Sequence, residues 1–382
     1  MQDFTIQNCR VFSARDGFST ASLSVSDGRF APDVLPTEVC MDLGGLRVIP
    51  GLVDVHTHGR HGMDFVRADA EQLRRLRRSY AEIGVTTVVP TLASAPFAQW
   101  LEAIGRVREA GFCAVALEGR YLNPEKRGVH RADLLALPST DELMQIREAA
   151  GGLRVHLTVA PELDGAETFI RLARSFGYTV ALGHSAADYE ETCRAEEWGV
   201  NAYTHLFNAM PSLHHRNPGP VCRALTGDGY CELICDGFHL HPEIVAMVRR
   251  CKSAERIVLI TDSMEGTGCP DGEYTIAGET VRMVNGCALA ADGTIGGSTL
   301  ELPGAVLNFC TFTGADAETA LRCATDNPAR MLGIRDLCGG MEAGMPADFC
   351  VLDERGCIVR VFIGGREVPM PSPKPLLSPS DC

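Results

Sequence analysis

The 382-residue sequence predicts an α/β fold, a (β/α)8 TIM-type barrel with a small β-sandwich domain built from both chain ends. Three observations support this. Apolar, β-rich runs alternate with helical patterns through the middle of the chain, as in a series of βα units. Short strand patterns separated by turn residues occupy both ends of the chain. Side chains of the types that bind metals end several of the apolar runs, where parallel barrels place their active sites.

The two ends of the chain predict the β domain. We assign residues 1–49 and 335–368 to it and residues 50–334 to the barrel. The segment 369–382 is rich in Pro and Ser, so we expect a loose, flexible tail. Short strands are expected in the β domain at Phe4–Ile6, Ala21–Val25, Arg47–Ile49, Asp348–Leu352 and Ile358–Ile363.

Eight strands are expected in the barrel, with helical patterns between most of them. Examples of the helices are Ala70–Ile83 and Thr140–Ala149, the second behind a Ser139/Glu142 capping box. The segment Gly272–Gly293 interrupts the alternation with short strand and turn signals. The expected strands are Leu52–Val55, Val85–Val89, Ala114–Leu117, Leu153–Val159, Thr179–Leu182, Asn201–Thr204, Cys231–Cys235 and Ile257–Thr261.

Composition argues against several classes of function. The formal net charge is -14 and no basic stripe is present, so we expect no nucleic-acid partner. No apolar run approaches the length of a membrane span, so no membrane association is expected. The 16 cysteines are scattered without a C-x-x-C pair, and the N-terminus lacks a secretory pattern. We therefore expect reduced thiols and a cytoplasmic location.

The first barrel strand ends in two histidines, His56 and His58. Residues i and i+2 of a strand point to the same face, so both imidazoles can aim at one point, as a metal requires. Alone, the motif is also compatible with a barrel strand that carries two incidental polar residues.

Four more polar residues end other barrel strands. Glu118 ends the third, His184 the fifth, His205 the sixth and Asp262 the eighth. Each alone could be a solvated, capping or packing residue. Together with the first strand they place metal-ligand types at five strand ends on one barrel face, which predicts a metal site. His156, within the fourth strand, is expected to be a hydrogen-bonded core or near-site residue rather than a ligand.

These residues lie in segments that resemble the N-acetylglucosamine-6-phosphate deacetylase family of the amidohydrolase superfamily. The resemblance covers essentially the whole chain except the tail. Its most specific segments are Leu117–His130 (LEGRYLNPEKRGVH) and Thr204–Pro211 (THLFNAMP). The chain departs from the family pattern at Arg120 and at Ser263–Thr267, on the expected rim of the pocket.

The resemblance implies roles for individual residues. Glu118, His184 and His205 correspond to the main metal site, and Asp262 to the catalytic aspartate. His239 matches the histidine near the substrate carbonyl and phosphate. His56 and His58 add a second group of imidazoles, which Glu118 could bridge and Asp262 could complete. The positions that match substrate-binding residues are Val129, His130, Asn208, Ala209, Arg216, His239, Ile295, Gly296 and Gly297.

The implied reaction is metal-dependent hydrolysis of the acetamide of N-acetylglucosamine 6-phosphate to glucosamine 6-phosphate and acetate, a step of amino-sugar catabolism. One or two divalent metals per chain are expected, and the ligand types suit zinc, iron, manganese or cobalt. No lysine lies near Leu153–Val159 to bridge two metals, so Glu118 is the natural substitute. The family is commonly dimeric, and the loop with Arg216 can reach a neighbouring subunit, so we expect a homodimer.

Two alternatives stay open at the level of sequence. The first is another amidohydrolase, such as an N-acyl-amino-acid deacylase or a cyclic-amide hydrolase. The second is a barrel without chemistry that serves as an assembly scaffold. The phosphate-side residues argue against the first, and the intact set of metal-ligand types argues against the second.

Overall fold

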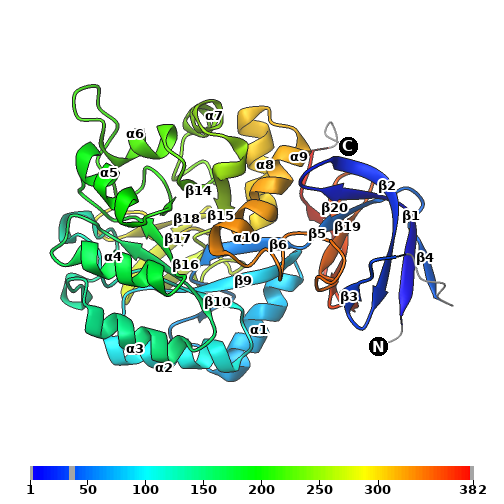
Figure 1. The fold of residues 1–382 in the computed structure, drawn as a ribbon, viewed down its shortest axis with the longest axis horizontal. Coiled ribbons are helices and arrows are strands. Elements are labelled where there is room, and N and C mark those ends of the chain that lie inside the picture. Colours follow the sequence, from blue (N-terminus) through cyan, green and yellow to red (C-terminus); the bar gives the residue numbers. More distant parts are fainter. Residues whose placement is uncertain (1–2, 34–38, 379–382) are drawn as a thin grey trace.

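Eight parallel strands form the barrel in chain order, as the sequence predicts (Figure 1). The computed structural model describes residues 3–33 and 39–378. The ring closes where the Asp262 amide donates to the His56 carbonyl at 2.9 Å. The strands are β6 (Leu52–Thr57), β9 (Val85–Leu92), β10 (Ala114–Leu117), β11 (Arg154–Val159), β12 (Thr179–Leu182), β13 (Ala202–Tyr203), β14 (Tyr230–Ile234) and β15 (Ile257–Ile260).

Helices follow the strands and surround the barrel (Figure 1). The Ser139 side chain accepts a hydrogen bond from the Glu142 amide, as the predicted capping box requires. The Glu142 carboxylate, however, binds Arg120 and Tyr121 instead of closing the box, because these partners lie beside it. The surrounding helices are α1 (Ala70–Ala81), α2 (Phe97–Glu109), α3 (Thr140–Ala150), α4 (Ala166–Ser175), α5 (Tyr189–Trp198), α6 (Gly219–Thr226), α7 (Pro242–Cys251) and α8 (Leu302–Thr313).

Further short helices complete the barrel. Of the described helices, none is long and apolar enough to cross a membrane. The 3-10 turns are η1 (Pro124–Lys126), η2 (Ala132–Leu134) and η3 (Ala254–Arg256), and the last helices are α9 (Ala317–Cys323) and α10 (Asp326–Leu332).

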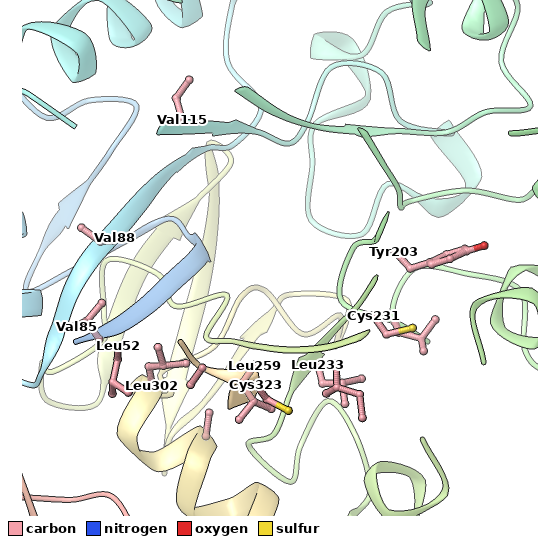
Figure 2. Packing of buried hydrophobic residues seen from close by; sticks show 14 of the residues in the cluster. Leu52, Val85, Val88, Val115, Tyr203, Cys231, Leu233, Leu259, Leu302 and Cys323 are labelled. Atoms are coloured by element: carbon pink, nitrogen blue, oxygen red, sulfur yellow. The ribbon is translucent and has the colours of Figure 1, made fainter. Parts of the chain in front are cut away.

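Alternate residues of each strand pack outward against the helices. Figure 2 shows Leu52, Val115, Leu233 and Leu259 in this layer, all fully or almost fully buried. Burying such a side chain contributes about 1.5–3 kcal/mol. Because side chains alternate along a strand, the residues between them point into the barrel.

A separate sheet joins the two ends of the chain beside the barrel (Figure 1). β5 and β19 pair antiparallel, which brings residues 47–50 against residues 349–352. The sheet has its own core, in which the rings of Phe349 and Phe362 stack at 4.3 Å. The domain boundaries themselves stay a prediction. The strands are β1 (Phe4–Ser13), β2 (Gly17–Ser26), β3 (Arg29–Phe30), β4 (Cys40–Asp42), β5 (Arg47–Pro50), β19 (Phe349–Leu352), β20 (Cys357–Ile363), β21 (Arg366–Val368) and β22 (Lys374–Pro375).

Part of the tail is packed rather than loose, which corrects the expectation for 369–382. β22 pairs with β20, and Leu376 and Leu377 are buried in the main core. The Lys374 ammonium also lies 2.9 Å from the Glu301 carboxylate. The prediction was based on the Pro- and Ser-rich composition and gave no weight to the two adjacent leucines, which pack against apolar residues. Residues 379–382 lie outside the described part of the chain.

The interruption at Gly272–Gly293 is a three-stranded antiparallel sheet of β16 (Gly272–Ile276), β17 (Glu279–Val284) and β18 (Cys287–Ala290). Its apolar residues form a small cluster with Val129 and Met264, which lie next to site residues. The sheet therefore packs against the C-terminal end of the barrel. A short hairpin of β7 (Gly59–Arg60) and β8 (Met63–Asp64) follows the first barrel strand.

Candidate functional site

The six predicted metal-ligand residues meet at the C-terminal ends of the barrel strands. His56 lies in β6 and His58 directly follows it, while the others come just after β10, β12, β13 and β15. His184, His205 and Asp262 adopt positive φ angles of 48°, 29° and 51°. Such backbone costs about 1–3 kcal/mol per residue and is characteristic of functional sites.

Glu118 stands between two groups of imidazoles. Its Oε1 lies 3.1 Å from His184 Nε2 and 2.9 Å from His205 Nε2. Its Oε2 lies 3.2 Å from His56 Nε2 and 3.0 Å from His58 Nε2. Asp262 Oδ1 joins the second group at 3.1 Å from His58 Nε2 and 3.5 Å from His56 Nε2. One carboxylate thus offers one oxygen to each group.

The outer nitrogens of these imidazoles have acceptors that fix the ring orientation. His58 Nδ1 lies 3.2 Å from the Thr91 carbonyl, and His184 Nδ1 lies 2.8 Å from the Lys126 carbonyl. A carbonyl only accepts, so each Nδ1 must carry the proton. In the neutral ring the Nε2 lone pair then points at Glu118, which is the arrangement of metal-binding histidines.

The donor atoms fit divalent metals in two groups: His56, His58, Glu118 and Asp262, and Glu118, His184 and His205. Within each group the ligand atoms lie within 4.8 Å of one another. Metal–ligand bonds of about 2.0–2.2 Å place neighbouring donors roughly 3.0–3.5 Å apart, close to the spacing here. His184 Nε2 and His205 Nε2 face each other at 3.1 Å, which requires a proton or a cation between them.

The charges of the site also favour a cation. Burial alone would raise the pKa of Glu118, but neighbouring imidazoles, His56 first, hold it well below its usual range. Burial likewise opposes the shift at Asp262, yet the His58 hydrogen bond and the His56 charge lower its pKa to about 2. The pKa of His58 rises to about 9 against the effect of burial, because Asp262 and Glu118 accept its proton. A metal bound by these groups would displace the protons that they hold.

A cavity of about 590 Å³ opens above these residues. His56 and Gly296 do not line it, and both are buried. Lys126 and Arg127 also line the cavity. Neither was predicted as a site residue, although both lie within the family-specific segment Leu117–His130. The predicted residues on the wall are His58, Glu118, Val129, His130, His184, His205, Asn208, Ala209, His239, Asp262, Ile295 and Gly297.

Two further histidines of the cavity are held by polar partners. His239 Nδ1 lies 2.7 Å from Asp236 Oδ2, and His130 Nδ1 lies 2.8 Å from the Ser94 hydroxyl. Burial and the charge of His184 lower the pKa of His130 to about 3. His130 is therefore a neutral ring beside the metal-ligand cluster.

Arg216 does not line the cavity of its own chain and is exposed. Leu213 in the same loop is 45% exposed. The loop that carries Arg216 therefore faces outward from its own chain, and the substrate-binding role of Arg216 stays a prediction.

The two departures from the family pattern have structural partners outside the cavity. The Arg120 guanidinium binds Glu142 and lies over the Phe97 ring, so it braces the loop after β10. The Ser263 hydroxyl is buried and lies 2.7 Å from the Thr57 hydroxyl. Neither side chain lines the cavity.

Glu232 is a further residue of the site that was not predicted from the sequence. It lies in the middle of β14, is fully buried, and lies 3.1 Å from His56 Nδ1 and 3.0 Å from His156 Nε2. His156 is thus a hydrogen-bonded near-site residue, as predicted. The available signal was a single acidic residue inside the apolar run Cys231–Cys235, since a buried carboxylate requires partners.

Four imidazoles and two carboxylates meet at the C-terminal strand ends of a TIM-type barrel. This arrangement is typical of barrel hydrolases that hold a catalytic metal. The model of the amidohydrolase family matches residues 47–368. The chain belongs to the amidohydrolase family and, within it, to the N-acetylglucosamine-6-phosphate deacetylases. The predicted family is therefore confirmed, against both the other amidohydrolases and the non-enzymatic scaffold.

Individual relatives cover almost the whole chain. An N-acetylgalactosamine-6-phosphate deacetylase of Escherichia coli O157:H7 is 35% identical, covering 90% of this chain and 93% of its own. An N-acetylglucosamine-6-phosphate deacetylase of Vibrio furnissii is 32% identical, with 95% and 91% covered. The structure of a Mycobacterium smegmatis N-acetyl-D-glucosamine-6-phosphate deacetylase mutant, in complex with N-acetyl-D-glucosamine-6-phosphate, aligns with a TM-score of 0.89 at 30% identity. It covers 96% of this chain and 99% of its own.

Proposed function

We propose that this chain hydrolyses the acetamide of N-acetylglucosamine 6-phosphate to glucosamine 6-phosphate and acetate. The observation that carries the proposal is the pair of donor groups that share Glu118 at the floor of the cavity. The cavity volume of about 590 Å³ is within the usual range for small-molecule sites.

Hydrolysis of an acetamide is slow without catalysis, because water is a weak nucleophile and an amine is a poor leaving group. A bound divalent metal supplies two effects: it polarises the carbonyl and lowers the pKa of water to about 7. Asp262 is ionised at neutral pH and takes the proton of the attacking water. As the carbon–nitrogen bond breaks, Asp262 returns this proton to the departing amine.

His239 is placed to stabilise the negative charge that develops on the carbonyl oxygen. Asp236 holds its Nδ1 at 2.7 Å and so fixes the ring. When both ring nitrogens carry protons, Nε2 donates to the oxygen while Nδ1 keeps Asp236. His239 lines the same cavity as Asp262, which supports the assignment.

Glu118, His184 and His205 would hold the tighter, essential metal, which would supply a Lewis acid beside the cavity. A second metal would be held by His56, His58 and Asp262 together with Glu118. The identity of the metals is not specified by imidazole and carboxylate donors, which suit zinc, iron, manganese and cobalt.

We assign phosphate binding to cationic and amide groups of the cavity. Lys126, Arg127 and Asn208 line the cavity in a strongly acidic protein, and each can donate hydrogen bonds to an anion.

We further propose a homodimer in which the exposed Arg216 reaches the cavity of the neighbouring subunit. The exposure of Leu213 beside it supports an interface at this loop. We also propose a cytoplasmic location, which the scattered cysteines without a C-x-x-C pair support.

A second candidate substrate differs from the first in the configuration of one sugar carbon. One relative is named for N-acetylgalactosamine 6-phosphate, so the axial epimer at C4 is the natural competitor. Steady-state kinetics on both 6-phosphates and on unphosphorylated N-acetylglucosamine separate the possibilities. We expect the highest kcat/KM on N-acetylglucosamine 6-phosphate. A clearly higher kcat/KM on N-acetylgalactosamine 6-phosphate would show that the galacto epimer is the substrate. A higher kcat/KM on the unphosphorylated sugar would contradict the proposed phosphate site.

A further inference from the structure

Glu232 and His156 form a buried polar pair inside the barrel, beneath the metal-ligand cluster. Glu232 is 0% exposed and His156 is 1% exposed. They come from β14 and β11, which are not neighbours in the barrel sheet. A buried carboxylate is costly unless its oxygens are bonded, so its presence in a barrel core calls for a specific role.

Both carboxylate oxygens have imidazole donors. Oε1 lies 3.0 Å from His156 Nε2, and Oε2 lies 3.1 Å from His56 Nδ1. With both oxygens facing imidazole nitrogens, the carboxylate accepts from each of them, so His56 donates from Nδ1. Its Nε2 lone pair then points at Glu118 Oε2, 3.2 Å away.

This partner distinguishes His56 from the other imidazoles of the cluster. His58 and His184 donate to backbone carbonyls, of Thr91 and Lys126. His205 Nδ1 has no hydrogen-bond partner among the described atoms. A carboxylate behind a ligating imidazole orients the ring and raises its basicity more than a neutral carbonyl does.

We propose that Glu232, braced by His156, is a positioning residue that tightens metal binding at the His56/His58 half of the site. The inference rests on the proposed two-metal arrangement and goes beyond its ligands. Loss of such a partner typically weakens metal binding by about 10–100-fold. In the Glu118/His184/His205 half, His184 Nδ1 has its own acceptor in the Lys126 carbonyl, and Glu232 contacts this half only through the His205 backbone amide, at 3.4 Å. Neither ligating ring of this half is held by Glu232, so its affinity should stay close to that of the parent protein.

A purely structural role is the rival explanation, since the pair also ties β6, β11 and β14 together. It makes a different prediction. A structural pair would lower the unfolding temperature of the metal-free protein and leave both metal affinities unchanged.

The test is titration of metal-free full-length protein with zinc by calorimetry, with bound metal counted after desalting. Glu232→Gln keeps the shape and removes the charge, and Glu232→Asp keeps the charge and withdraws it by one methylene. Glu196→Gln is the matched control, because Glu196 forms a partly buried ion pair with Arg223 away from the cluster.

We expect two equivalents in the parent and in Glu196→Gln. In both Glu232 variants the tighter equivalent should persist and the other should bind about 10–100-fold more weakly. If Glu232→Gln does not fold, Glu232→Asp decides. The inference is overturned by two equivalents of parental affinity in the Glu232 variants, by equal weakening of both, or by a single equivalent in the parent.

Activity on N-acetylglucosamine 6-phosphate is measured on the same samples. Parent protein that holds two metals without hydrolysing this substrate would contradict the proposed function. The metal titration would still decide the role of Glu232, so the two failures are distinguishable.

Discussion

Replacing Asp262 with asparagine removes the group that we assign to proton transfer and keeps its shape. Asp262 Oδ1 lies 3.1 Å from His58 Nε2, and its pKa of about 2 makes it an ionised acceptor at neutral pH. An amide at the same place cannot take a proton. We expect kcat to fall by about 10²–10⁴-fold, the usual contribution of general acid–base catalysis. At about 1.36 kcal/mol per decade, this is a barrier increase of about 2.7–5.4 kcal/mol.

The assay is the initial rate of acetate release at saturating N-acetylglucosamine 6-phosphate, with metal content and circular dichroism measured on the same preparation. The metal count separates lost proton transfer from lost metal, since Asp262 also contacts the His56/His58 group. Asp188→Asn is the matched control, because Asp188 caps α5 and asparagine caps helices equally well. A folded, metal-replete Asp262→Asn protein with near-parental kcat would refute the assignment.

Three further outcomes are expected. Arg216→Ala should raise KM for the phosphorylated sugar by about 10-fold or more through loss of a charge-assisted pair. Arg171→Ala, an exposed control, should leave this KM unchanged. An unchanged preference of Arg216→Ala for the phosphorylated over the unphosphorylated sugar would exclude Arg216 from the phosphate site. The double variant His56→Gln/His58→Asn should reduce two metal equivalents to one and keep some activity; one equivalent in both proteins would exclude a metal from this pair. Leu376→Ala should lower the free energy of unfolding by about 2–5 kcal/mol in denaturant titration, whereas parental stability would mean that the tail contributes nothing.

The fold could be predicted because the barrel repeats one simple pattern. Each strand buries both faces, so apolar runs such as Ala114–Leu117 stand out, and the helical patterns between them complete the βα units. The tail could not be predicted in the same way. Leu376 and Leu377 lie among Pro and Ser residues, and only the packed core shows that they have apolar partners.

The site was predictable where a ligand type ended a strand. His184 and Asp262 follow apolar runs directly, and strand ends of a parallel barrel share one face. Glu232 was not recognised, because it sits within a strand and its partners come from other strands. The exposed position of Arg216 agrees with the family resemblance, which implied a loop that can reach a neighbouring subunit.

The most direct test of the account is acetate release from N-acetylglucosamine 6-phosphate by one sample carried through metal removal and metal return. Metal content is measured at each stage. We predict hydrolysis by the metal-replete protein, loss of activity when the metal is removed, and recovery when zinc, iron, manganese or cobalt is returned. Folded protein that holds its metal and releases no acetate from this substrate would contradict the account.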